Sequence, residues 1–214
     1  MIINVLVGGP VSEWPDDLFT GKEKEIWVGA DRGALRLIKR GLTPAVSIGD
    51  FDSSSSTERK QIFKASRKVI TAKAEKDDTD TELALKVIFE EFEVERINLY
   101  GATGGRIDHL LANLFFVLRQ PFYAYLEQIF IYDRFNSIRF FKPGKHQLVK
   151  ETDKKYLAFV PLTAVKKLSL FDEKYRLSEV DFNYPISLAS NEFTGSEGNF
   201  SFESGVVCVI QSKD

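Results

Sequence analysis

The aspartates of this chain gather just beyond short apolar runs of the sequence. Asp31 directly follows the run at 26–30, and the segment DFD directly follows the run at 45–49. Others follow the runs at 68–71 and 96–100, and the whole set is Asp31, Asp50, Asp52, Asp77, Asp78, Asp80 and Asp108. Carboxylate oxygens suit Mg²⁺, which usually takes one or two protein carboxylates together with phosphate oxygens. The clustering therefore indicates a site for a metal ion and a phosphate compound.

The DFD segment places two carboxylates two positions apart. If its backbone is extended, Asp50 and Asp52 point to the same side, about 7 Å apart, and Phe51 turns into the protein. Two solvated loop aspartates would also explain this pair taken alone. The expected arrival of Asp77 and Asp80 at the same place favours the metal site.

Residues 77–82 lead into a predicted helix. Thr79 and Glu82 fit a capping box, and acidic residues near a helix N-terminus also favour the helix dipole. For Asp78 and Asp80 that explanation stands beside a metal or nucleotide role. Asp77 lies outside the predicted helix, so capping accounts for it less well.

The segment GATGGRIDH at 101–109 is the candidate phosphate loop. Its glycines (Gly101, Gly104 and Gly105) let backbone amides approach an anion at a helix start, and Arg106 can reach phosphate oxygens. The segment is neither a Walker A loop nor a GxGxxG fingerprint, and a simple glycine turn is the alternative. The glycine pair Gly8–Gly9 is a similar but weaker candidate for a phosphate loop. His109 beside the helix start is more often structural than an acid or base.

These residues need elements that bring them together. Five apolar runs, at 2–7, 26–30, 45–49, 68–71 and 96–100, alternate with segments of helical periodicity, of which the clearest is 107–118. Such alternation predicts an α/β domain with a mostly parallel sheet and flanking helices. Ligands bind at the carboxyl ends of such strands, so the aspartates are expected to converge on one edge.

The pattern changes after about residue 125. Short β-type runs separated by turn residues replace the helical periodicity, which predicts an all-β C-terminal sandwich or barrel; we expect the sandwich. The predicted domains are 1–125, α/β and catalytic, and 126–214, a β-sandwich. In the second domain Phe193 follows Ser190-Asn191-Glu192, and an aromatic ring beside polar groups could flank a flat heterocycle. Cys208 alternates within an apolar strand and is expected in the core.

The composition excludes several classes of protein. Of 214 residues, 43% are hydrophobic, and 29 basic residues nearly balance 31 acidic ones, so neither disorder nor binding to nucleic acid or an anionic membrane is indicated. One cysteine forms no intrachain disulfide and no cysteine metal site. No apolar run approaches a membrane span. We expect a soluble cytoplasmic protein.

Five segments in order resemble the thiamine pyrophosphokinase (thiamine diphosphokinase) family: GADRGA, SIGDFDS, KDDTDTELAL, GATGGRIDHLLAN and SNEF, at 29–34, 47–53, 76–85, 101–113 and 190–193. The resemblance spans most of the chain. It implies transfer of a pyrophosphoryl group from ATP to the hydroxyl of thiamine, giving thiamine diphosphate and AMP. It also implies Mg²⁺ and a homodimer with active sites at the subunit interface. The α/β domain at 1–125 would bind the nucleotide and the metal, and the β-sandwich at 126–214 would bind thiamine and form the dimer.

The resemblance assigns roles position by position. The magnesium and phosphate carboxylates would be Asp50, Asp52 and Asp77, with Arg106 and Asp108 completing the catalytic set. The ATP site would include Asp31, Asp80, Thr103, Gly104 and Gly105. Thiamine would contact Ser190, Asn191 and Phe193, which could serve the partner subunit's site. Some relatives carry Gln at the position of His109, which argues against an indispensable proton transfer by this residue.

Three alternatives remain open on the sequence. The first is a Mg²⁺-dependent diphosphokinase of another hydroxymethyl heterocycle, such as a pterin. The second is a phosphatase in which Asp50 is the nucleophile, although the resembling segment normally begins the sheet in such enzymes. The third is a nucleotide sensor or thiamine carrier without turnover, which seldom needs so many carboxylates.

Overall fold

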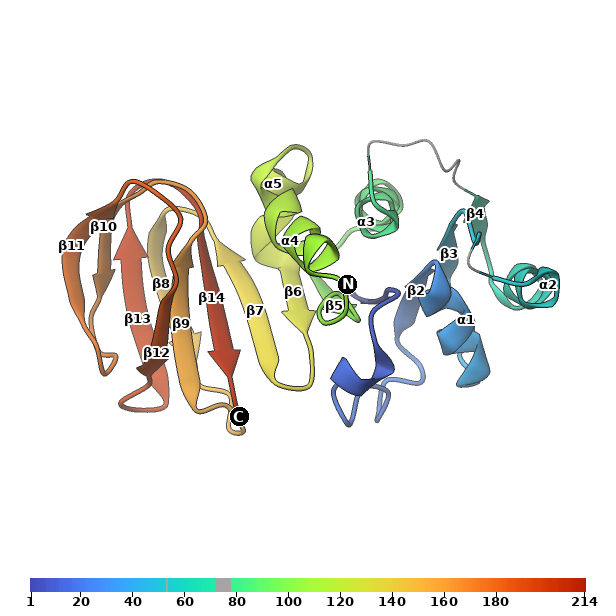
Figure 1. The fold of residues 1–214 in the computed structure, drawn as a ribbon, viewed down its shortest axis with the longest axis horizontal. Helices are drawn as coiled ribbons and strands as arrows, with labels where there is room; N and C mark the ends of the chain where they lie inside the picture. Colours follow the sequence, from blue (N-terminus) through green and yellow to red (C-terminus); the bar gives the residue numbers. More distant parts are fainter. Residues whose placement is uncertain (53, 72–77) are drawn as a thin grey trace. The chain divides into compact units, whose positions relative to one another are not determined.

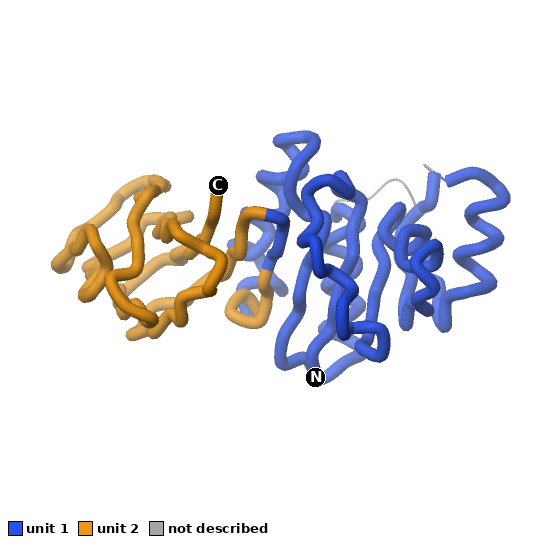
Figure 2. The backbone as a smooth tube through the Cα atoms, turned by 90° about the horizontal axis from the view of Figure 1, so that it is seen from below, with its two compact units in different colours: residues 1–124, 131–134 blue, residues 125–130, 135–214 orange. Residues whose placement is uncertain are grey.

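The computed structural model describes residues 1–52, 54–71 and 78–214. Within it the chain divides into two compact units, coloured separately in Figure 2. The first unit comprises 1–124 and 131–134, and the second comprises 125–130 and 135–214. The sequence placed the division after residue 125, whereas the structure interleaves the two units over 125–134.

The first unit contains the expected parallel sheet (Figure 1). Its strands follow the predicted apolar runs and are β1 (Ile2–Leu6), β2 (Ile26–Ala30), β3 (Val46–Gly49), β4 (Val69–Thr71) and β5 (Arg96–Tyr100). They pair side by side in the order β5-β1-β2-β3-β4, all parallel. The prediction of a mostly parallel α/β sheet is therefore confirmed. Since the strands are parallel, their carboxyl ends lie along one edge.

Helices connect these strands. They are α1 (Arg32–Lys39), α2 (Ser56–Ala65), α3 (Asp80–Glu91), α4 (Ile107–Phe115) and α5 (Phe122–Tyr125), with short 3₁₀ turns η1 (Val11–Glu13), η2 (Phe116–Leu118) and η3 (Leu126–Gln128). The predicted helix at 107–118 ends at Phe115 and tightens into η2. Helix α2 was not predicted, because Ile62 is its one fully buried residue among those the structure describes, so no apolar period marks it.

Helix α1 packs on the sheet with backbone against backbone. A side-chain Cβ at Gly33 would lie 1.9 Å from the carbonyl oxygen of Leu6 in β1, and one at Gly29 would lie 2.3 Å from the Cα of Ala34. Only glycine permits this approach. The helix therefore holds its pocket-facing residues at a fixed distance from the strand ends.

The second unit is a β-sandwich. Its strands are β7 (Asn136–Phe141), β8 (Gly144–Val149), β9 (Tyr156–Pro161), β10 (Val165–Leu170), β11 (Leu177–Phe182), β12 (Leu188–Glu192), β13 (Glu197–Phe202) and β14 (Val207–Ser212), while β6 (Ile129–Tyr132) crosses the division between the units. One antiparallel layer runs β12-β9-β14-β7 and the other β11-β10-β13-β8. Side chains of both layers, among them Phe159 and Phe200, share one buried cluster. The all-β prediction is confirmed as a sandwich.

Within the described ranges, none of the helices is both long enough and apolar enough to span a membrane. Cys208 is fully buried in β14, as expected, and burial raises the pKa of its thiol to about 12.

Candidate active site

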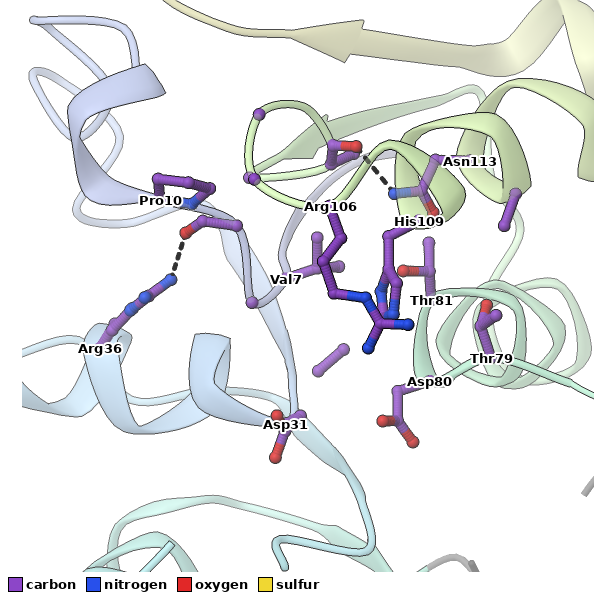
Figure 3. A pocket seen from close by; sticks show the side chains of 18 of the residues that line it. Val7, Pro10, Asp31, Arg36, Thr79, Asp80, Thr81, Arg106, His109 and Asn113 are labelled. Atoms are coloured by element: carbon purple, nitrogen blue, oxygen red, sulfur yellow. Dashed lines mark hydrogen bonds between the residues drawn. The ribbon is translucent and has the colours of Figure 1, made fainter. Parts of the chain in front are cut away.

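A pocket of about 610 Å³ opens at the carboxyl ends of the parallel strands (Figure 3). Residues just beyond β1, β2, β3 and β5 line it, together with the first turns of α3 and α4. Its polar lining consists of Asp31, Arg36, Asp50, Asp78, Thr79, Asp80, Thr81, Arg106, His109 and Asn113. Segments that are tens of residues apart in the sequence therefore meet in one concave site, which is where an open α/β sheet binds ligands.

Asp31 and Asp50 reach the pocket from neighbouring strands. Asp31 precedes α1 with a positive φ of 46°, and its backbone N–H donates to the carbonyl of Ile48 at 2.8 Å. Asp50 follows β3 and is half-buried, and its Oδ1 accepts a hydrogen bond from the backbone N–H of Asp52 at 2.9 Å. The two carboxylates are thus held at adjacent strand ends by backbone hydrogen bonds.

The backbone between Asp50 and Asp52 is not extended, which corrects the sequence expectation. Phe51 has a φ of 54°, in the left-handed region, so the chain reverses there. As expected, Phe51 turns inward and is 1% exposed. Asp52 is exposed and does not line the pocket. Arg59 of α2 holds the chain in this conformation, because its Nε donates to the carbonyl oxygen of Phe51 at 2.8 Å.

The first turn of α3 supplies the remaining described carboxylates. Asp80 is the first residue of the helix, and the capping box of Thr79 and Glu82 predicted from the sequence is present. Asp78 pairs with Lys86 and with Arg119, and these two cations lower the pKa of its carboxyl, Lys86 more strongly. The predicted ligand Asp77 lies outside the described residues.

The donor chemistry of the pocket fits Mg²⁺. Asp31, Asp50 and Asp80 line the pocket and supply hard oxygen donors. Among the described residues, no three His, Cys, Asp or Glu side chains form a group that could hold a metal ion by themselves. Mg²⁺ does not require one, because it commonly binds one or two carboxylates and completes its octahedron with water and substrate phosphate.

The glycine segment after β5 also lines the pocket. Gly101, Gly104 and Gly105 all have positive φ values, which other residues adopt at a cost. Asn113 of α4 is buried and donates to the carbonyl oxygen of Ala102 at 2.8 Å, which holds the segment against the helix. Thr103 is also buried, and its hydroxyl has no hydrogen-bond partner in the described part of the chain. Thr103 does not line the pocket.

Arg106 and Asp108 form a local ion pair at the start of α4. The Arg106 Nε donates to Asp108 at 3.1 Å, a second guanidinium N–H also donates to it, and both side chains are exposed. Arg106 lowers the pKa of the Asp108 carboxyl. Arg106 lines the pocket, whereas Asp108 does not. His109 is exposed and lines the pocket.

Sequence reasoning missed several pocket residues. Arg36 was overlooked because the helix that contains it was recognised from its apolar residues, and its polar residues were not considered as ligands. Asn113 carried a usable signal, since an amide within the apolar series of 107–118 predicts a buried hydrogen bond. Thr79 was recognised only as a capping residue and Thr81 was not singled out, yet both line the pocket.

The predicted thiamine residues lie in the second unit. Ser190 is exposed and adopts a φ of 63° at an irregularity of β12. Asn191 is 3% exposed, and its side chain accepts from the N–H of Tyr175 and donates to its carbonyl oxygen, at 2.9 and 2.8 Å. Phe193 packs in the sandwich core. Of these predicted contacts, Ser190 is the one that the structure leaves open to solvent, while Tyr175 is 59% exposed.

A parallel sheet with acidic strand ends, a glycine-rich segment leading into a helix and an attached β-sandwich define a two-unit α/β protein with a site suited to a metal-bound phosphate compound. The comparisons give the family. Residues 20–128 match the model of the thiamin pyrophosphokinase catalytic domain, and residues 145–207 match the model of its vitamin B1 binding domain. The chain belongs to the thiamin pyrophosphokinase family.

Individual relatives support this membership over the whole chain. The chain is 36% identical over 217 residues to the thiamine pyrophosphokinase of Bacillus subtilis (strain 168), covering 99% of each. A crystal structure of a thiamin pyrophosphokinase family protein from Enterococcus faecalis is 43% identical, with a TM-score of 0.95 and full coverage of both chains. The crystal structure of a protein from Lactobacillus plantarum is 51% identical, with a TM-score of 0.91 over 100% of this chain and 99% of that one.

Proposed function

We propose that this chain transfers the pyrophosphoryl group of ATP to the hydroxyl of thiamine, giving thiamine diphosphate and AMP. The observation that carries the proposal is that Asp31, Asp50 and Asp80 line the same pocket as the glycine segment with Gly101, Gly104 and Gly105, in a member of this family. Family membership also weighs against the pterin-type diphosphokinase and the phosphatase. The cytoplasmic location remains a prediction from composition.

Phosphoryl transfer of this kind depends mainly on positioning and charge stabilisation. Asp50, which lines the pocket, would hold Mg²⁺ together with the predicted ligands Asp52 and Asp77, although Asp52 lies outside the pocket lining. The bound ion would neutralise charge on the β- and γ-phosphates. The thiamine hydroxyl attacks the β-phosphorus and the bond to the α-phosphate oxygen breaks, so AMP leaves and the β,γ unit stays intact. Arg106 would have to exchange Asp108 for a phosphate oxygen. Because both side chains are exposed, this exchange costs little.

The proposed thiamine contacts are residues of the second unit, which could serve the partner subunit's site. Ser190 can contact a ligand directly because it is exposed. Asn191 would act indirectly, since its amide is committed to the backbone of Tyr175. Phe193 would support the segment from the core. These roles, like those of Thr103, Gly104, Gly105 and Asp108 on the ATP side, remain predictions.

The test is AMP formation from ATP and Mg²⁺, with and without thiamine. The wild type should form AMP and thiamine diphosphate in equal amounts, and only with thiamine present. Asp50→Asn should lower the rate by roughly 10²–10³-fold, because a metal-binding charge is lost at constant shape. Asp17→Asn, in an exposed side chain outside the pocket, is the matched control. Free phosphate without AMP would refute the proposal.

We further propose that the chain forms a homodimer with active sites at the subunit interface. Helix α4 supports this, because Ile107, Leu111 and Phe115 are 71%, 43% and 43% exposed and, at a spacing of four residues, share one face. Solvated apolar stripes of this kind mark interaction surfaces. Sedimentation at micromolar protein should give a dimer for the wild type and a monomer for Leu111→Glu. A monomeric wild type would contradict the dimer.

A further inference from the structure

Arg36 stands on the pocket wall with its guanidinium anchored at one end. One N–H donates to the carbonyl oxygen of Gly9 at 2.5 Å, the hydrogen bond drawn from Arg36 in Figure 3. The guanidinium also lies over the ring of Trp14 at 5.5 Å. Gly9 is held from its other side as well, because its own N–H donates to the carbonyl oxygen of Gly101 at 2.8 Å. Arg36 is thus fixed against the turn after β1, and this turn is fixed against the turn after β5.

Within the described part of the chain, no ion pair balances the charge on Arg36. Arg36 forms none with any carboxylate in the described ranges, whereas Arg106, the other guanidinium of the pocket lining, is paired with Asp108. Burial and the neighbouring Arg32 lower the pKa of Arg36, and together they outweigh the opposite effect of Asp31. A half-buried cation in this state gains free energy when an anion binds beside it.

The guanidinium also keeps unused hydrogen-bonding capacity. It carries five N–H donors in a rigid fork, a geometry that matches phosphate oxygens. The bond to Gly9 uses one donor, and the stack on Trp14 uses a face of the group rather than its edge. The glycine pair at 8–9 lines the same part of the pocket, and glycines let a phosphate group approach the backbone closely.

We propose that Arg36 and the Gly8–Gly9 turn form a second phosphate-binding element of the pocket, which takes a phosphate oxygen of the bound nucleotide beside the 104–106 segment. The identity of the nucleotide as ATP rests on the proposed function. The element itself is an anion site defined by Arg36, and it binds polyphosphate whether or not thiamine is the acceptor.

The experiment combines kinetics with binding of a probe that lacks adenosine. The variants are Arg36→Gln, Arg36→Lys and, as the matched control, Arg32→Gln, whose side chain is exposed on the same helix and outside the pocket lining. The KM for ATP and for thiamine is measured, together with the Kd of inorganic tripolyphosphate by calorimetry. Thermal unfolding of each variant is recorded alongside.

Arg36→Gln should raise both the KM for ATP and the Kd of tripolyphosphate by roughly 10- to 100-fold, the range expected for loss of a charge-assisted hydrogen bond. The KM for thiamine should stay within about twofold, because the lost contact is to phosphate. Arg36→Lys keeps the charge but loses the fork, so it should recover part of the affinity. Arg32→Gln should match the wild type.

Two results would overturn the inference. One is an Arg36→Gln protein with unchanged affinity for tripolyphosphate. The other is an equal loss of affinity for ATP and thiamine with a lowered unfolding temperature, which would mean that Arg36 merely supports the fold. If the wild type forms no thiamine diphosphate, the proposed function fails, but tripolyphosphate binding still decides the role of Arg36.

Discussion

Replacing Phe51 by alanine should destabilise the first unit and also displace the carboxylates of Asp50 and Asp52. Phe51 is 1% exposed and packs with Leu35 of α1 and Ile62 of α2. It is also the residue that reverses the chain between Asp50 and Asp52. The side chain therefore anchors the segment that positions both carboxylates.

The expected magnitude follows from burial and backbone conformation. Truncating a buried phenylalanine to alanine costs about 3–5 kcal/mol, and alanine retains the strain of a φ of 54°. Phe51→Gly loses the same ring but relieves roughly 1 kcal/mol of that strain, so it should be slightly more stable than Phe51→Ala. Phe51→Leu keeps an apolar anchor and should cost less than about 1.5 kcal/mol.

Tryptophan fluorescence is the appropriate assay. The chain has two tryptophans, Trp14 and Trp27, and both are buried in the first unit. Fluorescence therefore follows unfolding of this unit, while the β-sandwich contributes no tryptophan signal. At roughly 2–4 °C per kcal/mol for a chain of this size, Phe51→Ala should lower the fluorescence midpoint by about 6–20 °C. Turnover by the folded variant should fall about 100-fold, because displaced carboxylates lose their alignment.

Equal fluorescence midpoints for the wild type and Phe51→Ala would refute the anchoring role. A Phe51→Gly protein clearly less stable than Phe51→Ala would refute the strain assigned to the backbone. Near-normal turnover in a destabilised Phe51→Ala would show that the phenyl ring stabilises the first unit but is not needed to position the carboxylates.

Three further predictions concern other parts of the fold. Gly9→Ala should lower the unfolding free energy by about 1–3 kcal/mol, because its Cβ would lie 2.2 Å from the carbonyl oxygen of Gly101; Gly8→Ala meets nothing within 4 Å and should unfold like the wild type in urea. Lys154 and Lys213 lower the pKa of Asp153 to about 2, below its unfolded value, so its stabilisation is present above about pH 4 and is lost as pH falls toward 2. In an acid titration followed by circular dichroism, Asp153→Asn should lose less stability than the wild type between about pH 4 and 2. An unchanged titration curve would show that Asp153 does not contribute to stability. Cys208, with its pKa raised to about 12, should resist a thiol reagent at pH 8 and react only after unfolding; rapid labelling of the native protein would contradict its burial.

The sequence predicted the elements that bury apolar surface with a clear period. The five parallel strands appear where the apolar runs lie, and the rim they create follows from parallel pairing alone. The capping box of α3 was equally visible, because its two residues interact locally. In each of these cases the structure depends on residues close together in the sequence or on an alternation that one sheet imposes.

The features that escaped prediction depend on contacts between distant segments. Phe51 adopts a positive φ because Arg59 and the cluster around Ile62 hold it there, and neither is apparent from the letters DFD. The side chain of Asn191 is hydrogen-bonded to the backbone of Tyr175, sixteen residues away. The motif alone does not show this bond, and it suggested a ligand contact instead. Arg36 is held at the pocket by a hydrogen bond to the carbonyl oxygen of Gly9. The sequence does not reveal which backbone carbonyl a side chain will contact.

Glycines whose side-chain space is filled by backbone atoms constrain how this sequence can diverge. At most core positions a larger residue can be accommodated by a smaller neighbour, so paired substitutions accumulate over time. At Gly33 and Gly29 the obstructing atoms are the Leu6 carbonyl oxygen and the Ala34 Cα, which every amino acid shares. No second substitution can clear them. In a library of double mutants these two positions should show no compensating partners, so helix α1 can change its chemistry but not its distance from the sheet.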